Sequence, residues 1–329
     1  MRLKLHYIAI FVLGVFLFSG ISGVANASTK ASLFQITSDG SQQNGSLIYQ
    51  DIVAYTNFGG SKGINIYGYN LKTKQNFPIV TNPGQQFLTD FYKNFILYDD
   101  FDSSASAYHV HLFNMTTKQD IVINGNSGTQ NDGVTNGEDV FYINGGACGQ
   151  LYDYSLRGQK MTTLITQKVC TPLRMAKDIV VWSEGTGVYG YNVNKKQVFT
   201  IESLPNTLSQ VPSLDPEAST VVWMRSTGNT SAIVMKDLHT NKIKVLASST
   251  TDALNYPAIA DDFAVWSDSA GANLGSVQGI NLRNNELFTI YPQGSQENGN
   301  IIPALWNNTA VWMSYRTGNG DIYGATISK

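Results

Sequence analysis

The chain has 329 residues and a formal net charge of −2, and only 14% of its residues are Asp, Glu, Lys or Arg, against a typical share of about 25%. The sequence contains no runs of Lys and Arg, which contacts to phosphates require, so the composition argues against a nucleic-acid partner. Its uncharged polar residues, mainly Asn, Gln, Ser, Thr and Gly, are typical of exported proteins that face carbohydrate or a cell wall.

The N-terminus has the features of an export signal. A short basic segment precedes an apolar run over residues 7–18, and "ANA" at 25–27 has the small-x-small form of a signal peptidase site. The run is shorter than the ~20 residues that span a bilayer, so we expect cleavage rather than a retained anchor. We therefore expect residues 28–329 to form one secreted domain, extracellular or at the cell surface, monomeric and free of the membrane.

An aromatic residue closes a short apolar run seven times along the rest of the chain. The intervals between these residues are 43, 44, 40, 41, 43 and 46. A period of this length is typical of propellers or solenoids. The seven aromatic residues are Tyr55, Tyr98, Tyr142, Trp182, Trp223, Trp266 and Trp312.

The content of each repeat indicates four antiparallel strands. A continuous apolar run such as "IVVW" (179–182) indicates a strand buried on both faces. An alternating segment such as "GVYGYNV" (187–193) indicates a half-buried strand. A short strand precedes this pair and another follows it, and no helical period of useful length appears. Four strands at this period make one propeller blade, so we expect an all-β, seven-bladed β-propeller.

The two ends of the chain are expected to complete one blade together. The last repeat stops at residue 329 without a fourth strand. The segment "LFQIT" (33–37) is similar to the fourth strands "VFTI" (198–201) and "LFTI" (287–290). The N-terminal strand near 33–37 should therefore complete the seventh blade and close the ring.

These repeats resemble TolB-like and related cell-surface β-propellers. The resemblance rests on apolar-Val-Trp runs, the Gly/Asn-rich loops that follow them, and segments such as "DIYGATI" (321–327). It covers nearly all of the chain after residue 27 and implies a propeller fold. The chain differs from TolB itself, which has six blades and a separate α/β domain.

The sequence has two cysteines, Cys148 and Cys170. An even number in an exported protein favours a disulfide between them, and two buried free thiols are the alternative. No metal site is expected from the sequence. A weak Ca²⁺ site at Asp99, Asp100 and Asp102 is possible on residue type, but these residues lack the order of an EF-hand loop, and a solvated loop is the preferred interpretation.

A ring of polar side chains is predicted at one mouth of the central channel. Amide residues stand at the start of the first strand in six repeats, and charged residues follow some of the aromatic anchors. Amides both donate and accept hydrogen bonds, as sugar hydroxyls do; alternatively, they cap backbone groups or hold channel water. The predicted ligand-binding residues are Asn44, Gln86, Asn131, Gln210, Asn255, Asn300, Arg225 and Arg316.

The leading functional interpretation is a secreted, non-catalytic binding or scaffold module that recognises a carbohydrate or a protein. The scarcity of histidine is the main reason to favour a binder over an enzyme. The alternative is an extracellular polysaccharide lyase or glycoside hydrolase, which would use a carboxylate pair drawn from Asp100, Glu184 and Asp268. A purely structural wall component is a third possibility.

Overall fold

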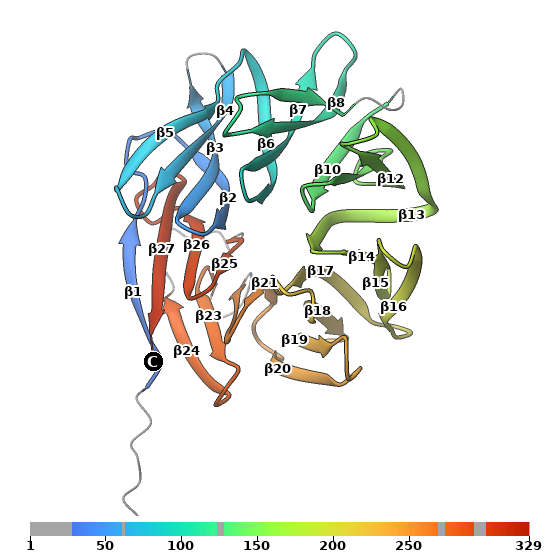
Figure 1. Ribbon diagram of the computed structural model, residues 1–329. Coiled ribbons are helices and arrows are strands. Elements are labelled where there is room, and N and C mark those ends of the chain that lie inside the picture. The colour runs from blue at the N-terminus through green and yellow to red at the C-terminus, as the bar shows by residue number, and fades with distance from the viewer. Residues whose placement is uncertain (1–27, 61–62, 124–127, 269–273, 293–300, 329) are drawn as a thin grey trace, which may run out of the picture.

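The computed structural model describes residues 28–60, 63–123, 128–268, 274–292 and 301–328, and every helix or strand in these ranges is a β-strand. The expected signal segment, residues 1–27, lies outside the described residues. No helix within these ranges has the length and apolar character needed to cross a membrane. The sheets are arranged around a common centre (Figure 1). The prediction of an all-β fold built from antiparallel sheets is confirmed.

The first sheet has eight strands that form two similar runs. β4 and β6 join the runs by a short parallel pairing, and all other neighbours pair antiparallel. The strands are β2 (Gln43–Tyr49), β3 (Ile52–Gly60), β4 (Gly63–Asn70), β5 (Gln75–Val80), β6 (Gly84–Tyr92), β7 (Phe95–Asp102), β8 (Ala107–Asn114) and β9 (Asp120–Val122).

The second sheet has seven strands, and one of them serves two runs. β13 has 17 residues and pairs first with β12 and then with β14. The strands are β10 (Gln130–Thr135), β11 (Asp139–Asn144), β12 (Cys148–Ser155), β13 (Lys160–Ala176), β14 (Ile179–Glu184), β15 (Gly187–Asn192) and β16 (Gln197–Ser203).

The remaining three sheets have four strands each, and the last one joins the first strand of the structure, β1, to the last, β27. Two are continuous runs: β17 (Leu208–Leu214), β18 (Thr220–Thr227), β19 (Thr230–Asp237) and β20 (Ile243–Ser249); then β21 (Leu254–Ala260), β22 (Phe263–Asp268), β23 (Val277–Asn281) and β24 (Glu286–Tyr291). The last combines β25 (Ala304–Trp306), β26 (Thr309–Ser314) and β27 (Asp321–Ser328) with β1 (Lys30–Gln35), which pairs with β27.

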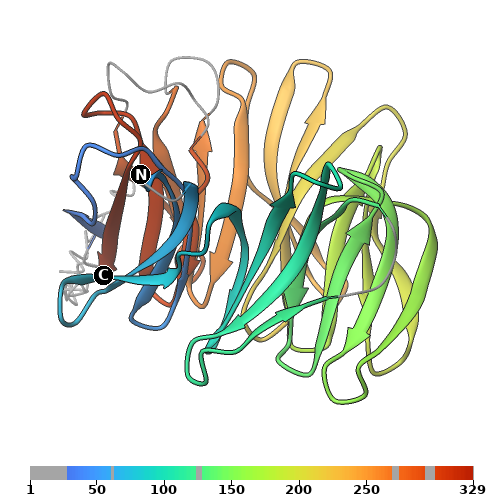
Figure 2. The ribbon, with the colours of Figure 1, turned by 90° about the horizontal axis from the view of Figure 1, so that it is seen from above.

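The hydrophobic core lies between neighbouring runs of strands, including the two runs within each of the larger sheets. The seven repeated aromatic residues are all buried, each 3% exposed or less. Trp266 of β22, for example, packs in one cluster with Val222 and Ile233 of the preceding sheet. A single run of strands cannot bury its apolar face alone. This explains why an apolar segment that ends in an aromatic residue recurs along the chain. The sheets stand side by side, with their hairpin loops gathered at two opposite ends (Figure 2).

The predicted disulfide between Cys148 and Cys170 is present. Cys148 lies in β12 and Cys170 in β13, and the two residues face each other in the pairing of these strands. The bond therefore joins adjacent strands at the point where β13 passes from one partner strand to the next.

Candidate functional site

A cavity of about 330 Å³ lies among the first strands of the runs. We call these first strands the inner strands. They are β2, β6, β10, the last part of β13, β17, β21 and β25. The cavity lies toward the ends at which the inner strands turn into the following strands, and we call this side of the molecule the cavity end. It is lined by residues 46–49, 90–92, 174–177, 211–214, 216–217, 256–259 and 302–306.

Three aromatic residues form one wall of this cavity. The ring of Tyr49 lies 4.3 Å from that of Trp306 and 5.7 Å from that of Tyr92, measured between centroids. Each residue is the last of its inner strand, in β2, β25 and β6 respectively. The chain turns directly after each of them. We call the three rings the aromatic wall, and such a surface suits a ligand with an apolar ring face.

Asp90 and Arg174 also line the cavity. Asp90 accepts a hydrogen bond at 3.0 Å from the backbone N–H of Thr135. Burial raises the pKa of Asp90 to about 6, and nearby Arg174 and the backbone donors only partly oppose this rise. The carboxyl group can therefore exchange a proton near neutral pH.

Within the described ranges, Arg174 makes one side-chain hydrogen bond, at 2.7 Å, from Nη1 to the carbonyl oxygen of Leu173. Among the residues that the structure describes, no carboxylate forms an ion pair with Arg174. Since a guanidinium carries five N–H donors, most of its donors are available to an anionic ligand.

Two further carboxylates support the segment that carries Arg174. The backbone N–H of Leu173 donates a short hydrogen bond to Asp132 Oδ2. The backbone N–H of Asp132 in turn donates to Asp99 Oδ2 at 3.2 Å. Burial raises the pKa of both carboxyl groups. At Asp132 the positive charge of Arg174 opposes this rise only in part. The guanidinium is therefore positioned through its backbone and lies close to two aspartates, Asp90 and Asp132.

The predicted amide residues that the structure describes lie at the opposite end of the inner strands, which we call the amide end. None of them lines the cavity. Asn44 Oδ1 accepts from the N–H of Gly45 at 2.7 Å, and Asn255 Oδ1 from that of Tyr256 at 2.9 Å. These two amides therefore cap the next backbone donor.

The pairing register between the inner strand and the next strand shifts just after these amides, which is a β-bulge and explains why the amides cap a backbone N–H. A bulge of this kind follows Asn44, Asn131, Gln210 and Asn255. The next residue has a positive φ in each case, 51° at Val211 and 48° at Tyr256 for example, a conformation that costs energy for most residues. The amide positions thus belong to a repeated backbone feature.

The other predicted amides have separate surroundings. Gln86 is 1% exposed and donates from Nε2 to Asp100 Oδ1 at 2.9 Å. Asn131 has a buried Oδ1 with no hydrogen-bond partner in the described part of the chain, and Gln210 is exposed. Asn300 lies outside the described residues. None of the described amides lines the central cavity.

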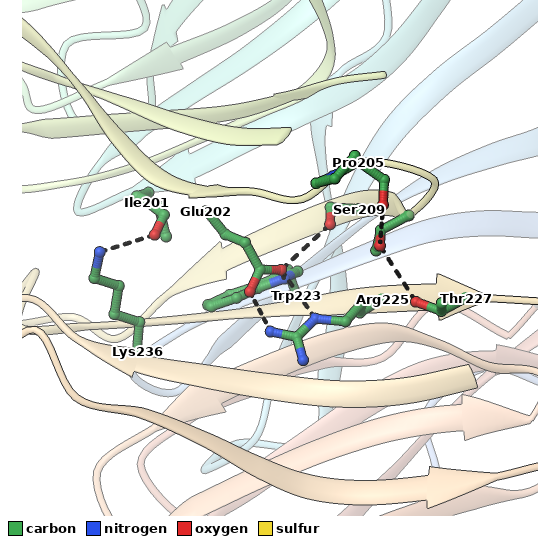
Figure 3. Close-up of polar contacts among 9 residues, drawn as sticks. Ile201, Glu202, Pro205, Ser209, Trp223, Arg225, Thr227 and Lys236 are labelled. Atoms are coloured by element: carbon green, nitrogen blue, oxygen red, sulfur yellow. Dashed lines mark hydrogen bonds and ion pairs between the residues drawn. The ribbon is translucent and has the colours of Figure 1, made fainter. Parts of the chain in front are cut away.

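Arg225 is bound by a buried carboxylate at the amide end (Figure 3). Glu202 accepts hydrogen bonds from Arg225 Nε at 3.0 Å, from Trp223 Nε1 at 2.9 Å and, more weakly, from Ser209 Oγ at 3.4 Å, and it also pairs with Arg225 Nη2. The Glu202 side chain is 4% exposed and that of Arg225 is 19% exposed. The charge of Arg225 is therefore balanced inside the protein.

Arg316, the other predicted arginine, lies over an aromatic ring. Its guanidinium carbon is 4.0 Å from the ring centroid of Tyr291, and Nη2 donates to the carbonyl oxygen of Pro292 at 3.0 Å. The residue as a whole is exposed.

The predicted carboxylates lie in three different sheets. Asp100 is in β7, Glu184 ends β14 and Asp268 ends β22. Asp268 is 1% exposed and accepts from Ser276 Oγ at 3.2 Å, and burial raises its pKa to about 6. No hydrogen bond joins any two of these carboxylates among the described residues.

The proposed calcium ligands are strand residues rather than members of one loop. Asp99, Asp100 and Asp102 all belong to β7, so Asp99 points to the opposite face from Asp100 and Asp102. Asp102 accepts from the N–H and Oγ of Ser104. Within the described ranges, no group of three or more His, Cys, Asp or Glu side chains could hold a metal ion.

Sequence reasoning missed the residues that line the cavity. A signal was present: an aromatic residue stands before two turn residues in "IYQD" (48–51), "FYKN" (91–94) and "LWNN" (305–308). The residue that follows the aromatic one in each segment has a positive φ, which defines the turn; these residues are Gln50, Lys93 and Asn307. The pattern occurs in fewer than half of the repeats, whereas the amides occur in nearly all of them.

Comparison with known proteins places the fold among the β-propellers. No protein-family model matches the sequence, and no curated protein matches it significantly. Similar solved structures include an oligogalacturonate lyase in complex with manganese, at TM-score 0.67 and 13% identity over 92% of this chain and 95% of that one.

Two further structures belong to peptide-cleaving enzymes. One is a puromycin-hydrolyzing peptidase from Mycobacterium tuberculosis, at TM-score 0.64 and 10% identity over 84% of this chain and 49% of that one. The other is the β-propeller domain of the Trilobed protease from Pyrococcus furiosus, at TM-score 0.64 and 8% identity over 88% of this chain and 94% of that one. The propeller fold expected from the resemblance is confirmed at this level.

These comparisons overturn the leading functional interpretation. The prediction of a non-catalytic binding module is wrong on these findings, because the similar structures come from a lyase and a peptidase. The alternative of an extracellular polysaccharide lyase or glycoside hydrolase agrees with them better. The physical reason for the error is that histidine count was used as a measure of catalytic capacity, although a desolvated aspartate beside an arginine can also move protons.

Proposed function

We propose that the chain is a polysaccharide lyase that acts on chains containing uronic acids, with the central cavity as its active site. The observation that carries this proposal is the presence of Arg174 and Asp90 in one cavity beside the aromatic wall. Arginine suits the planar carboxylate of a uronate, the aromatic wall suits the apolar face of the sugar ring, and Asp90 can act as a base near neutral pH. The lyase of similar fold is named for a substrate of this class, oligogalacturonate.

The reaction is a β-elimination. Arg174 binds the uronate carboxylate and stabilises the negative charge that develops on it as the neighbouring C–H proton leaves. Asp90, ionised, accepts that proton. The electron pair forms a carbon–carbon double bond, and the bond to the glycosidic oxygen breaks. Tyr49 is protonated at neutral pH because the ordinary pKa of a tyrosine is about 10 and burial raises it further. We assign to it the donation of a proton to the leaving oxygen.

Manganese is not part of this proposal. The lyase structure carries that ion, but the charged groups that line this cavity are Asp90, Arg174 and an exposed pair of Glu217 with Lys177. A divalent cation needs several oxygen ligands directed at one point, and this set does not fit it. No step is therefore assigned to a metal.

Glycoside hydrolysis is the second candidate, because two carboxylates line the cavity. Glu217 is the other one. It is exposed and forms an ion pair with Lys177, which makes it a weaker candidate than Arg174 as the partner of Asp90. The two reactions give different products, since elimination leaves an unsaturated sugar and hydrolysis leaves a saturated one.

We also propose that the fold has seven blades and that the N-terminal strand closes the ring. Residues 28–329 then form one exported, monomeric domain. The pairing of β1 with β27 supports closure. The inner strands also contact one another in turn, from β2 through β6, β10, β13, β17 and β21 to β25 and back to β2. The disulfide supports an oxidising location outside the cytoplasm.

The test is an activity screen of residues 28–329 against polygalacturonate, other uronate polymers and neutral glycans, with the ultraviolet absorbance of the unsaturated product as readout. We expect activity on a uronate polymer, and a loss of about 10²–10⁴-fold in Asp90→Asn. Asp100→Asn is the matched control, because Asp100 is a hydrogen-bonded aspartate of the amide end. Activity that survives in Asp90→Asn but fails in Asp100→Asn would place the reaction at the amide end instead.

A further inference from the structure

A second recess lies beside the cavity and shares a wall with it. Its volume is about 430 Å³, and Trp306 lines both spaces. The recess lies where β2 and β25 turn into the strands that follow them, so both spaces are at the cavity end of the molecule. A ligand that leaves the cavity across the indole of Trp306 would enter the recess directly.

The chemistry of the recess differs from that of the cavity. Asp51 and Lys72 form an ion pair at 2.5 Å, which leaves neither charge unbalanced. Gln50 and Asn307 are exposed amides on the rim. Neutral amides that donate and accept hydrogen bonds fit sugar hydroxyls, whereas the balanced ion pair offers no net charge to a carboxylate.

We propose that this recess is a second sugar subsite, which holds the continuation of the same glycan chain whose uronate unit lies at Arg174. The inference rests on the proposed function, and it adds that the substrate is an oligomer or polymer bound through two joined spaces. Trp306 packs against Tyr49 on the cavity side, so its indole is held in place as the platform over which the chain passes. The subsite takes a hydroxyl-rich sugar with or without a carboxylate, while the cavity requires the acid.

The backbone allows the side chains of this subsite to be removed cleanly. Gln50 and Asn307 have φ values of 53° and 51°, a region that glycine adopts without cost. The double variant Gln50→Gly, Asn307→Gly therefore removes both amides and relieves backbone strain. Asp261→Gly is the matched control, because Asp261 is an exposed turn residue with φ of 49° in another sheet and lines neither space.

The experiment measures binding in the slow Asp90→Asn background, by calorimetry with oligomers, from the dimer upward, of the uronate polymer that the activity screen shows to be cleaved. We expect affinity to rise with the length of the oligomer. For the longer oligomers the double variant should bind about tenfold more weakly than its parent, which is equivalent to the loss of one or two net hydrogen bonds. Affinity for the dimer should stay unchanged, and Asp261→Gly should behave like its parent.

Two outcomes would overturn the inference. If the dimer binds but longer oligomers gain nothing, or gain as much in the double variant as in its parent, the recess is not a subsite and the proposed active site still stands. If no oligomer binds at all, the proposed function fails and the subsite fails with it.

Discussion

The two ends of the inner strands differ in how their charged groups are paired. At the amide end, Glu202 takes up the charge of Arg225, Gln86 donates to Asp100, and Asn44 and Asn255 cap their own backbone. At the cavity end, an arginine without an ion-pair partner among the described residues shares an open space with an aspartate of raised pKa. The amide end has the residue types of a binding site, but its arginine is already paired with a buried carboxylate. The cavity end instead places Arg174 and Asp90 around an open space that a ligand can enter.

The largest effect should come from Arg174. Arg174→Met removes the cation that stabilises the developing charge, so we expect kcat/KM on a uronate polymer to fall by about 10²–10³-fold. Arg174→Lys keeps the charge but loses the planar fork, and should recover only part of the rate. Steady-state kinetics of both variants, with circular dichroism to verify folding, measure this. Full activity in Arg174→Met would remove the main distinction between the two ends.

Arg225 should show the opposite behaviour. Arg225→Met leaves the carboxylate of Glu202 buried without its cation, and we expect the free energy of unfolding to fall by about 3 kcal/mol. Urea denaturation measures this, and Arg174→Met should lose far less. If Arg225→Met is as stable as the parent yet inactive, Arg225 belongs to a substrate site and the amide end is functional.

The stability of the fold should depend on pH through Asp90. Its pKa in the folded protein is about 6, against an ordinary value of 3.8, so the folded state holds this proton more tightly than the unfolded state. The contribution of Asp90 to stability is therefore greatest at low pH and falls as pH rises between about 4 and 6, by up to about 2 kcal/mol. Melting temperatures across this range should show a shallower fall in Asp90→Asn, and Asp268→Asn is the matching variant at the amide end. An unchanged slope in Asp90→Asn would mean that the carboxyl group is not desolvated.

The smallest effect should come from the capping amides. Asn44→Ala and Asn255→Ala each remove one hydrogen bond to a backbone N–H, so we expect each to lower the free energy of unfolding by about 1 kcal/mol or less. Neither should change kcat/KM, as denaturation and kinetics on the same preparations would test. A loss of activity with unchanged stability would restore the amide ring as a binding site.

Much of the fold could be predicted from the sequence, because it repeats a local rule. Runs such as "IVVW" are buried on both faces wherever they occur, and each needs a neighbouring sheet to cover it, so the architecture follows from the pattern. The pairing of Cys148 with Cys170 could also be predicted, since the chain offers no other partner.

The site could not be predicted in the same way, because it depends on what the repeats do differently. Asp90 and Arg174 occupy inner strands of two different sheets, and nothing in either local sequence indicates that they share a cavity. Whether Arg225 is available or bound depends on Glu202, which is 23 residues away in the sequence and in another strand. Regular positions are visible in one sequence, whereas pairings between irregular positions require the folded structure.

The long strand β13 links the periphery of the molecule to its centre without a loop. Cys170 fixes the middle of this strand to β12, and Arg174 follows four residues later in the same strand, paired with β14. β13 is thus held covalently at one residue, and it carries the guanidinium of Arg174 close to its C-terminal end. The position of this cation is therefore set by a continuous, cross-linked strand rather than by a loop, which would keep the charge aligned as a ligand enters and leaves the cavity.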